Sequence, residues 1–194
     1  MTEFSIPDTR LSDATLYLRP WDPQSETDVA AWLAGTNDAE FGRWNTPDRT
    51  ITSPAEARES LQRRESAWRD ATAASFCVTD RADGTILGHI AINAIAWNML
   101  RAQVGFWLLP EARGRHLSAR ALDLAALWAF DTLGLHRLEL YHAVGNEASC
   151  RIAERCRFEH EGVLRDRMFE SGERERFRDA HLHARLASDL RGRA

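Results

Sequence analysis

The sequence predicts an α/β fold (an α+β sandwich) in which helices cover both faces of one mixed, mostly antiparallel sheet. Three short apolar segments between residues 74 and 109 predict consecutive strands, and Asp83-Gly84 between the first two is a strong hairpin signal. Residues 117–133 place apolar side chains on one helical stripe. The alternating segment 137–144 follows this helix directly, so this crossover alone is expected to create a parallel pair of strands.

The other elements follow from local signals. Ser53 and Glu56 form a capping box with Pro54 at the first helical position, which predicts a helix to about residue 68. Residues 1–13 are expected to be a loose start, and the polar and aromatic stretch 35–52 is expected to be a loop. The remaining predicted strands span 15–19, 74–79, 86–95, 103–109, 162–168 and 180–187; the remaining helices span 27–34, closed by Gly35, and 146–156; a turn is expected at 171–172.

Length and composition limit the classes of protein to consider. The chain of 194 residues is expected to form one domain over 1–194, and an apolar fraction of 44% with seven tryptophans indicates a folded core. A formal net charge of −4 argues against a nucleic-acid or membrane partner. All 25 basic residues are arginine, which excludes a lysine nucleophile, a Schiff base and a Walker-type lysine.

Cysteine usage favours a reducing compartment. Cys77, Cys150 and Cys156 include no CxxC pair, and an odd number gives no disulfide framework. The N-terminus lacks a basic region followed by an apolar run, and no apolar stretch approaches the 18 or so residues of a membrane span. We therefore expect a cytoplasmic protein with reduced thiols.

A basic, glycine-containing turn joins the strand ending near residue 109 to the long helix. Backbone N–H groups and the positive end of the helix dipole converge there, and Arg113 and Arg115 add formal charge. Such a turn suits a pyrophosphate. The segment from Asn146 to Ser149 starts another helix after the next strand, so the two turns together predict a phosphate-bearing cofactor held across neighbouring strands.

Several motifs resemble one known family. VGFWLLPEARGR at 104–115, GLHRLELYHAVGNEASCRIAER at 134–155 and EGVLRDR at 161–167 occur in an order and spacing similar to those of the GCN5-related N-acetyltransferases, in particular the RimJ/RimL-type branch. TLYLRPW at 15–21 and DGTILGHI at 83–90 extend the similarity over nearly the whole chain. The resemblance implies acetyl-CoA as cofactor and acetyl transfer to an amine, and homodimers are common in that family.

The resemblance also implies a set of site residues. The backbone N–H of Leu108 or a neighbour would donate to the acetyl carbonyl oxygen, in a gap between splayed strands where the pantetheine arm lies. Ser149, from an Asn-x-x-Ser pattern with Asn146, would protonate the departing thiolate. The residues implied for cofactor binding are Leu108, Leu109, Arg113, Gly114, Arg115, His116, Leu117, Ser118, Ala119, Asn146 and Ser149.

Two alternatives stay open at the second turn. Ser149 would lie one turn inside its helix and could serve only to hydrogen-bond the backbone. Asn146 is a preferred N-cap residue, a role compatible with cofactor contact.

The sequence departs from the family pattern at three positions. His116 stands where the first glycine of the pyrophosphate loop is usual, Ser118 where the second small residue is usual, and Arg157 where glycine usually precedes Phe158. Histidine reaches positive φ more readily than most residues, and Gly114 can absorb part of the turn.

No general base can be assigned from the sequence. Gln103 occupies a position where related chains often carry a carboxylate, and glutamine cannot accept a proton usefully. Three other residues are candidates. Glu139 is as well explained by a solvated face and Glu161 by a structural role, so His142 is the leading titrating alternative. Deprotonation of the amine through water is the remaining route.

The acceptor region is less defined. The resemblance places Phe41, Trp44 and Trp97 beside the acceptor cleft, and the charged run 170–178 is most simply a solvated hairpin tip. His181 and His183 share one strand face, but the sequence offers no cysteine or carboxylate to complete a set of metal ligands with them. We therefore expect both histidines to lie on the surface, and we predict no metal site.

Two functions follow. The first is an acetyl-CoA-dependent N-acetyltransferase acting on a protein N-terminal amine or a small-molecule amine, with the negative net charge favouring a cationic acceptor. The second is a non-catalytic acyl-CoA-binding sensor or partner module, suggested by Gln103, His116, Ser118 and the missing base.

Overall fold

The computed structural model describes residues 4–45, 50–170 and 173–190. Its strands form one eight-stranded sheet in the order β1-β2-β3-β4-β5-β6-β8-β7. The strands are β1 (Leu11–Ser12), β2 (Leu16–Pro20), β3 (Ala74–Asp80), β4 (Ile86–Ala96), β5 (Arg101–Leu108), β6 (Arg137–Ala143), β7 (Glu159–Glu170) and β8 (Glu173–Leu186). The helices are α1 (Glu26–Thr36), α2 (Ala39–Trp44), α3 (Pro54–Arg69), α4 (Leu117–Asp131) and α5 (Glu147–Arg155), with 3₁₀ turns at Pro110–Ala112 and Ala187–Leu190.

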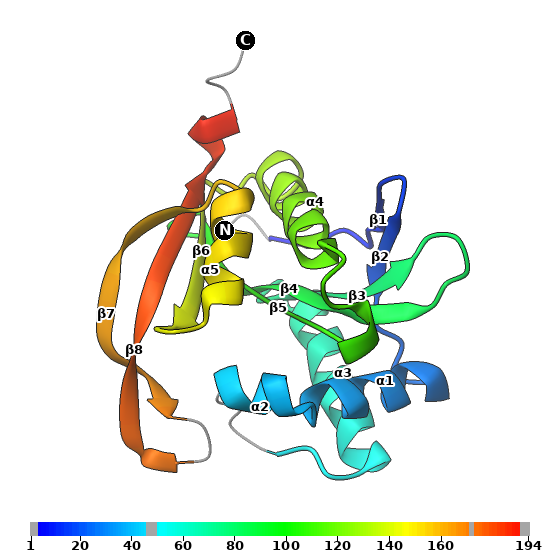
Figure 1. Ribbon diagram of the computed structural model, residues 1–194. Helices are drawn as coiled ribbons and strands as arrows, with labels where there is room; N and C mark the ends of the chain where they lie inside the picture. The colour runs from blue at the N-terminus through cyan, green and yellow to red at the C-terminus, as the bar shows by residue number, and fades with distance from the viewer. Residues whose placement is uncertain (1–3, 46–49, 171–172, 191–194) are drawn as a thin grey trace.

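The predicted fold class is confirmed. Every neighbouring pair of strands is antiparallel except β5 and β6, which are parallel and joined through α4. Helices α1, α2 and α3 lie on one side of the sheet, and α4 and α5 lie on the other (Figure 1). No helix within the described residues is both long enough and apolar enough to cross a bilayer.

Each face of the sheet has its own apolar core. The larger cluster includes Leu122 of α4, Leu140 of β6 and Phe158, all almost completely buried. The smaller cluster lies under α1 and α3 and centres on Trp21, Trp32 and Trp107, which together with His89 form a set of tilted and edge-on ring contacts. Burying this much aromatic surface explains why a chain with seven tryptophans holds short helices firmly on that face.

The predicted loop at 35–52 is wrong over part of its length, because α2 occupies 39–44. Asp38 caps this helix by accepting hydrogen bonds from the N–H groups of Glu40 and Phe41. A helix of six residues shows too little periodicity to be recognised from sequence. The first strand was missed as well, since Leu11–Ser12 pairs with β2 where a loose start was expected.

Gly35 has a different role from the predicted helix stop, because α1 continues to Thr36. A Cβ atom at this position would lie 2.2 Å from the ring of Trp107, so only glycine lets the helix approach that ring. The capping box of α3 also differs in detail: Ser53 accepts from the N–H of Glu56, while the Glu56 carboxylate accepts from the N–H of Thr52.

The last two strands form a twisted hairpin at the edge of the sheet opposite β1 (Figure 1). Both are longer than the predicted strands at 162–168 and 180–187, and β7 carries several register shifts. The turn predicted at 171–172 lies outside the described residues.

Candidate active site

The gap between β5 and β6 is the first feature of the site. The two strands pair only from Arg101↔Arg137 to Val104↔Leu140, although β5 continues to Leu108 and β6 to Ala143. The N–H of Leu109 donates to the carbonyl of Leu87, on the β4 side. Because successive N–H groups of a strand point to opposite edges, the N–H of Leu108 points toward the gap.

The first turn of α4 supplies the second feature. The N–H groups of Leu117, Ser118 and Ala119 precede the first intrahelical donor, and no side chain in the described part of the chain caps them. His116 immediately before them has φ 59°, and Gly114 has φ 74°. The histidine therefore adopts the left-handed conformation that glycine reaches most readily, and the turn forms with a histidine at this position.

The side chain of Arg113 is held by contacts within the protein. Its guanidinium donates to the carbonyl of Leu108 over 2.9 and 3.2 Å and pairs with Asp38, the cap of α2. Burial alone would raise the pKa of Asp38, but the hydrogen bond from Arg113 and two backbone N–H groups hold it below its ordinary value. Arg113 thus braces the end of β5 against α2.

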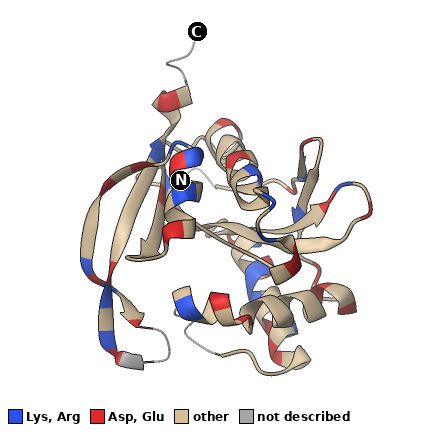
Figure 2. Ribbon diagram, in the orientation of Figure 1, with Lys and Arg blue, Asp and Glu red and all other residues tan. Residues whose placement is uncertain are grey.

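Arg115 points away from the gap, toward Asp80 at 3.8 Å. The structure instead brings two other cations to the gap, Arg151 and Arg155 of α5, and the Nη1 atom of Arg155 lies 3.2 Å from Nδ1 of His116. Figure 2 shows basic positions both on α5 and in the turn before α4. The i,i+4 spacing of 151 and 155 was the sequence signal that could have identified this basic face.

The N-terminus of α5 completes this side of the site. The Oδ1 atom of Asn146, which is buried, accepts from the N–H of Ser149 over 3.1 Å, so Asn146 is the N-cap. Ser149 is half-buried, and no hydrogen bond of its hydroxyl is found among the described residues. The hydroxyl is therefore available to a ligand.

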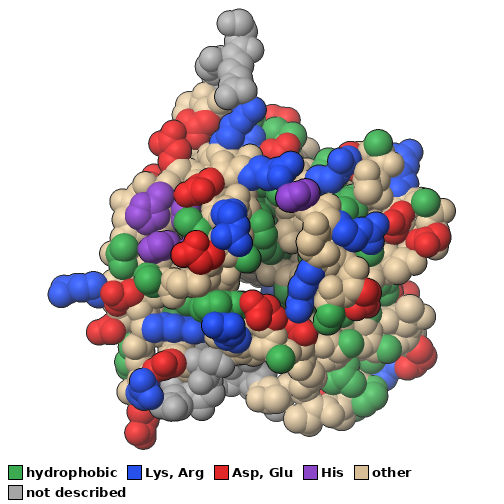
Figure 3. All heavy atoms as spheres, viewed as in Figure 1, with side chains coloured by type: hydrophobic (Ala, Val, Ile, Leu, Met, Phe, Trp, Pro, Cys, Tyr) green, Lys and Arg blue, Asp and Glu red, His purple; other side chains and the backbone are tan. Residues whose placement is uncertain are grey.

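These groups line one cavity of about 440 Å³, which we name the helix-end cavity. Figure 3 shows the surface hollowed at this level, above α2 and below α4 and α5. Its lining consists of Glu40, Phe41, Trp44, Asn45, Phe106, Trp107, Leu108, Arg113, Gly114, His116, Leu117, Ser118, Ala119, Asn146, Ala148, Ser149, Arg151, Ile152 and Arg155.

A second cavity of about 790 Å³ lies between α1, α3 and the sheet, and we name it the tryptophan cavity. The two cavities share Phe41, Asn45, Phe106 and Trp107, so they meet at the end of β5. The rest of its lining is Trp32, Thr36, Ile51, Glu59, Ser60, Arg63, Arg64, Ala67, His89, Asn93 and Gly105.

Comparison with known proteins identifies the family of this chain. Residues 15–159 match the family described as Acetyltransferase (GNAT) domain. The chain belongs to the GNAT acetyltransferase family. Acetyltransferases of this family use acetyl-CoA as their acetyl donor.

Individual relatives are more distant. One relative is YdaF of Bacillus subtilis (strain 168), which is named as a ribosomal N-acetyltransferase on a provisional basis. It is 32% identical over 90 residues, which cover 46% of this chain and 49% of YdaF. The spermidine N(1)-acetyltransferase of Vibrio cholerae is 26% identical over 95 residues, covering 49% of this chain and 55% of that enzyme. The chain thus matches about half the length of these curated relatives.

Among solved structures, RimL, a ribosomal L7/L12 alpha-N-protein acetyltransferase in complex with coenzyme A, superposes with a TM-score of 0.80. It is 23% identical, and the match covers 92% of this chain and 98% of RimL. At this identity the likeness supports the GNAT fold.

The two cavities do not include every residue that the sequence predicted for the site. Leu109 is buried with the smaller core and its N–H is already bonded, and Arg115 points elsewhere. Trp97 lines neither cavity; its ring stacks on Phe4 with centroids 4.7 Å apart, and its Nε1–H donates to the carbonyl of Ala71. Phe41 lines both cavities and Trp44 lines the helix-end cavity.

The two carboxylates considered as general bases, Glu139 and Glu161, both form ion pairs with Arg137. Glu139 accepts from the hydroxyl of Tyr141 at 2.5 Å and from Nε of Arg137 at 2.8 Å. Burial would raise the pKa of Glu139, but these two hydrogen bonds lower it below its ordinary value. Glu161 is held by the other guanidinium nitrogens of Arg137.

The expectation that His181 and His183 are surface residues without a completing ligand is wrong. His183 is completely buried, and the thiol of Cys150 on α5 lies 3.8 Å from its Nε2 atom. His142, considered above as a base, belongs to the same group. This group could not be recognised from the sequence, because its members come from three separate elements, β6, α5 and β8.

Proposed function

We propose that this GNAT enzyme transfers an acetyl group from acetyl-CoA to a primary amine by direct attack in a ternary complex. The observation that supports this most is the meeting of two cavities at Phe106 and Trp107. One cavity has the groups an anionic cofactor needs, and the other is larger and lies beneath α1 and α3, on the face of the sheet opposite α4 and α5. Two reactants that arrive from opposite faces react where their cavities join.

The chemistry of the helix-end cavity fits acetyl-CoA. Three uncapped N–H groups of α4, with Arg151 and Arg155 opposite, suit a pyrophosphate, and no acidic side chain lies in the first turn of α4. Leu108, Leu117 and Ile152 provide an apolar passage toward the gap beside β5. Bound acetyl-CoA supplies the acetyl group as a reactive thioester.

Two groups of the chain act at the junction. The N–H of Leu108 is directed into the gap and is placed to donate to a carbonyl oxygen there. The Ser149 hydroxyl has no partner among the described residues and is the proton donor that we assign to the leaving sulfur. With Glu139 held as an ion-paired carboxylate, the amine loses its proton through water.

The tryptophan cavity also limits the acceptor. Arg64 lines it, donates to Oδ1 of Asn93 over 2.9 Å and lies 5.6 Å from the ring centroid of Trp32. No carboxylate of the described residues lies within ion-pair distance of Arg64, whereas Arg63 pairs with Glu59. A half-buried cation without a counter-ion favours an acceptor that carries an anionic group as well as its amine. The negative net charge of the chain had instead favoured a cationic acceptor.

Release of free CoA thiol tests both parts of the proposal. The probes are a primary amine that bears a carboxylate and the matching amine in which a carboxamide replaces the carboxylate. We expect kcat/KM to favour the carboxylate about 10- to 100-fold, the scale of a charge-assisted hydrogen bond. Arg64→Gln should remove this preference while leaving turnover of the carboxamide unchanged.

Arg69→Gln is the matched control, since Arg69 is an exposed arginine of the same helix. Equal rates for both probes in the wild-type protein would reject the anionic acceptor and leave the acetyltransferase proposal standing. Tight binding of acetyl-CoA without thiol release for any amine in a broad panel would instead support the sensor function.

A further inference from the structure

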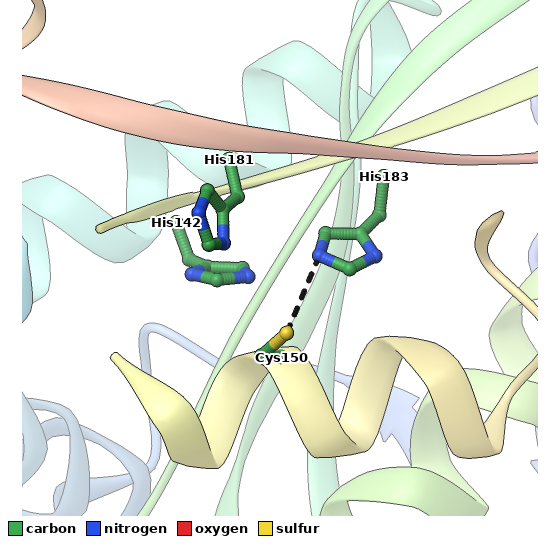
Figure 4. A group of neighbouring side chains, drawn as sticks. All are labelled: His142, Cys150, His181 and His183. Carbon is green, nitrogen blue, oxygen red and sulfur yellow. Dashed lines mark hydrogen bonds between the residues drawn. The ribbon is translucent and has the colours of Figure 1, made fainter. Parts of the chain in front are cut away.

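A cluster of three imidazoles and one thiol lies between the sheet and α5, outside both cavities. His142 of β6 pairs directly with His181 of β8, and His183 is two residues further along the same face. Cys150 comes from α5 and, unlike its neighbour Ser149, does not line the helix-end cavity. One ligand atom from each residue lies within 4.8 Å of all the others, and Figure 4 shows the four side chains converging.

The imidazoles are oriented by the protein backbone. The Nδ1 atom of His142 lies 3.1 Å from the carbonyl of Ala143, and Nδ1 of His183 lies 3.2 Å from the carbonyl of Phe158. A carbonyl only accepts, so both Nδ1 atoms carry the proton and both Nε2 atoms present a lone pair. Metal-bound histidines are usually held in this way, with the second ring nitrogen donating to a carbonyl or carboxylate.

Polar atoms of the cluster are buried without partners. Nε2 of His142 and Nδ1 of His181 are inaccessible to solvent, and neither has a hydrogen bond within the described residues. Leaving such atoms unpaired is costly, so their presence indicates a missing partner.

We propose that His142, Cys150, His181 and His183 form a binding site for a zinc ion. Three nitrogens and one sulfur in a closed, four-ligand arrangement are the donor set that favours Zn²⁺ among common metals. Tetrahedral Zn–N and Zn–S bonds of about 2.0–2.3 Å place the ligand atoms of a three-nitrogen, one-sulfur site about 3.3–3.6 Å apart, so the cluster needs to contract by roughly 1 Å. Binding releases the thiol proton of Cys150 to solvent.

Such an ion would connect α5 to the sheet. Cys150 follows Ser149 directly, and the first turn of α5 carries Asn146 and Ser149 into the helix-end cavity. Anchoring the helix at its fourth residue to β6 and β8 would hold that turn in place. The site is closed and gives the metal a structural role, apart from the acetyl transfer.

Cobalt titration of metal-free protein tests the site without any measurement of activity. We expect one Co²⁺ per chain, a thiolate-to-cobalt charge-transfer band in the near ultraviolet, and loss of that band when one equivalent of Zn²⁺ is added. Zinc should also raise the thermal midpoint of the wild-type protein by several degrees, because it binds only the folded state.

Cys150→Ala should lose the charge-transfer band, and His142→Gln should weaken cobalt binding at least tenfold. The matched controls are Cys156→Ala at the end of the same helix and His136→Gln on an exposed position, which should both retain the wild-type spectrum. Absence of a one-to-one cobalt complex in the wild-type protein would overturn the proposal, as would an unchanged band in Cys150→Ala.

Discussion

The two cavities that meet at Phe106 and Trp107 are built in different ways. The helix-end cavity takes its polar groups mainly from backbone N–H groups and helix termini, within the two segments 108–119 and 146–155. The tryptophan cavity takes its character from side chains of α1, α3, β4 and β5, which are far apart in sequence. The main-chain groups of the first cavity therefore persist when side chains change, although its proposed function also uses the side chains of Ser149, Arg151 and Arg155. The second cavity depends on its side chains throughout.

The largest expected effect is at the helix-end cavity. Ser118→Glu places a carboxylate among the uncapped N–H groups of α4, where it competes with any anionic ligand. Affinity for coenzyme A, measured by calorimetry, should fall about 10- to 100-fold, while the helix itself is stabilised by the acidic residue. Ser118→Gln is the neutral control and should bind nearly as the wild type does. Equal binding by the two variants would show that the pyrophosphate lies elsewhere.

A smaller effect is expected where packing forms the tryptophan cavity. Gly35→Ala drives a methyl group into the ring of Trp107, since the added Cβ would lie 2.2 Å from it. Overpacking of this kind destabilises by about 1–3 kcal/mol, which corresponds to a fall of about 2–10 °C in the thermal midpoint. In Gly42→Ala the new Cβ has no atom within 4 Å, so that variant serves as the matched control. Equal melting temperatures would refute this account of Gly35.

The smallest effect concerns the end of α5. Arg157 has φ 59°, a left-handed conformation that costs a residue with a side chain about 1–2 kcal/mol. Glycine avoids this strain but loses more conformational entropy on folding, so only part of the strain energy is recovered by the substitution. Arg157→Gly should therefore stabilise the protein by up to about 1 kcal/mol in urea unfolding. Arg151→Gly, within the helix, should do the reverse by a similar amount. Destabilisation by Arg157→Gly would show that its side chain contributes more than the backbone strain costs.

The difference between the cavities also explains which predictions from sequence succeeded. The turn at 113–118 and the cap at Asn146 were recognisable because their geometry arises within a few consecutive residues. The partners of Arg113 were not recognisable, because Asp38 is 75 positions away in the chain. Trp97 was assigned to the acceptor cleft on its position in the chain, and the structure packs it on Phe4 instead.

By itself, the sequence determined the order of the elements apart from β1 and α2, the parallel crossover through α4 and the turn before α4, since hydrophobic period, caps and glycines act locally. Only the tertiary structure decided which cations face the helix-end cavity, that Arg64 has no counter-ion among the described residues, and that three histidines and Cys150 converge. These features depend on the register of β6 against β8 and on the packing of α5. Both depend on the burial of side chains from segments that are distant in the sequence, so a local sequence pattern cannot predict them.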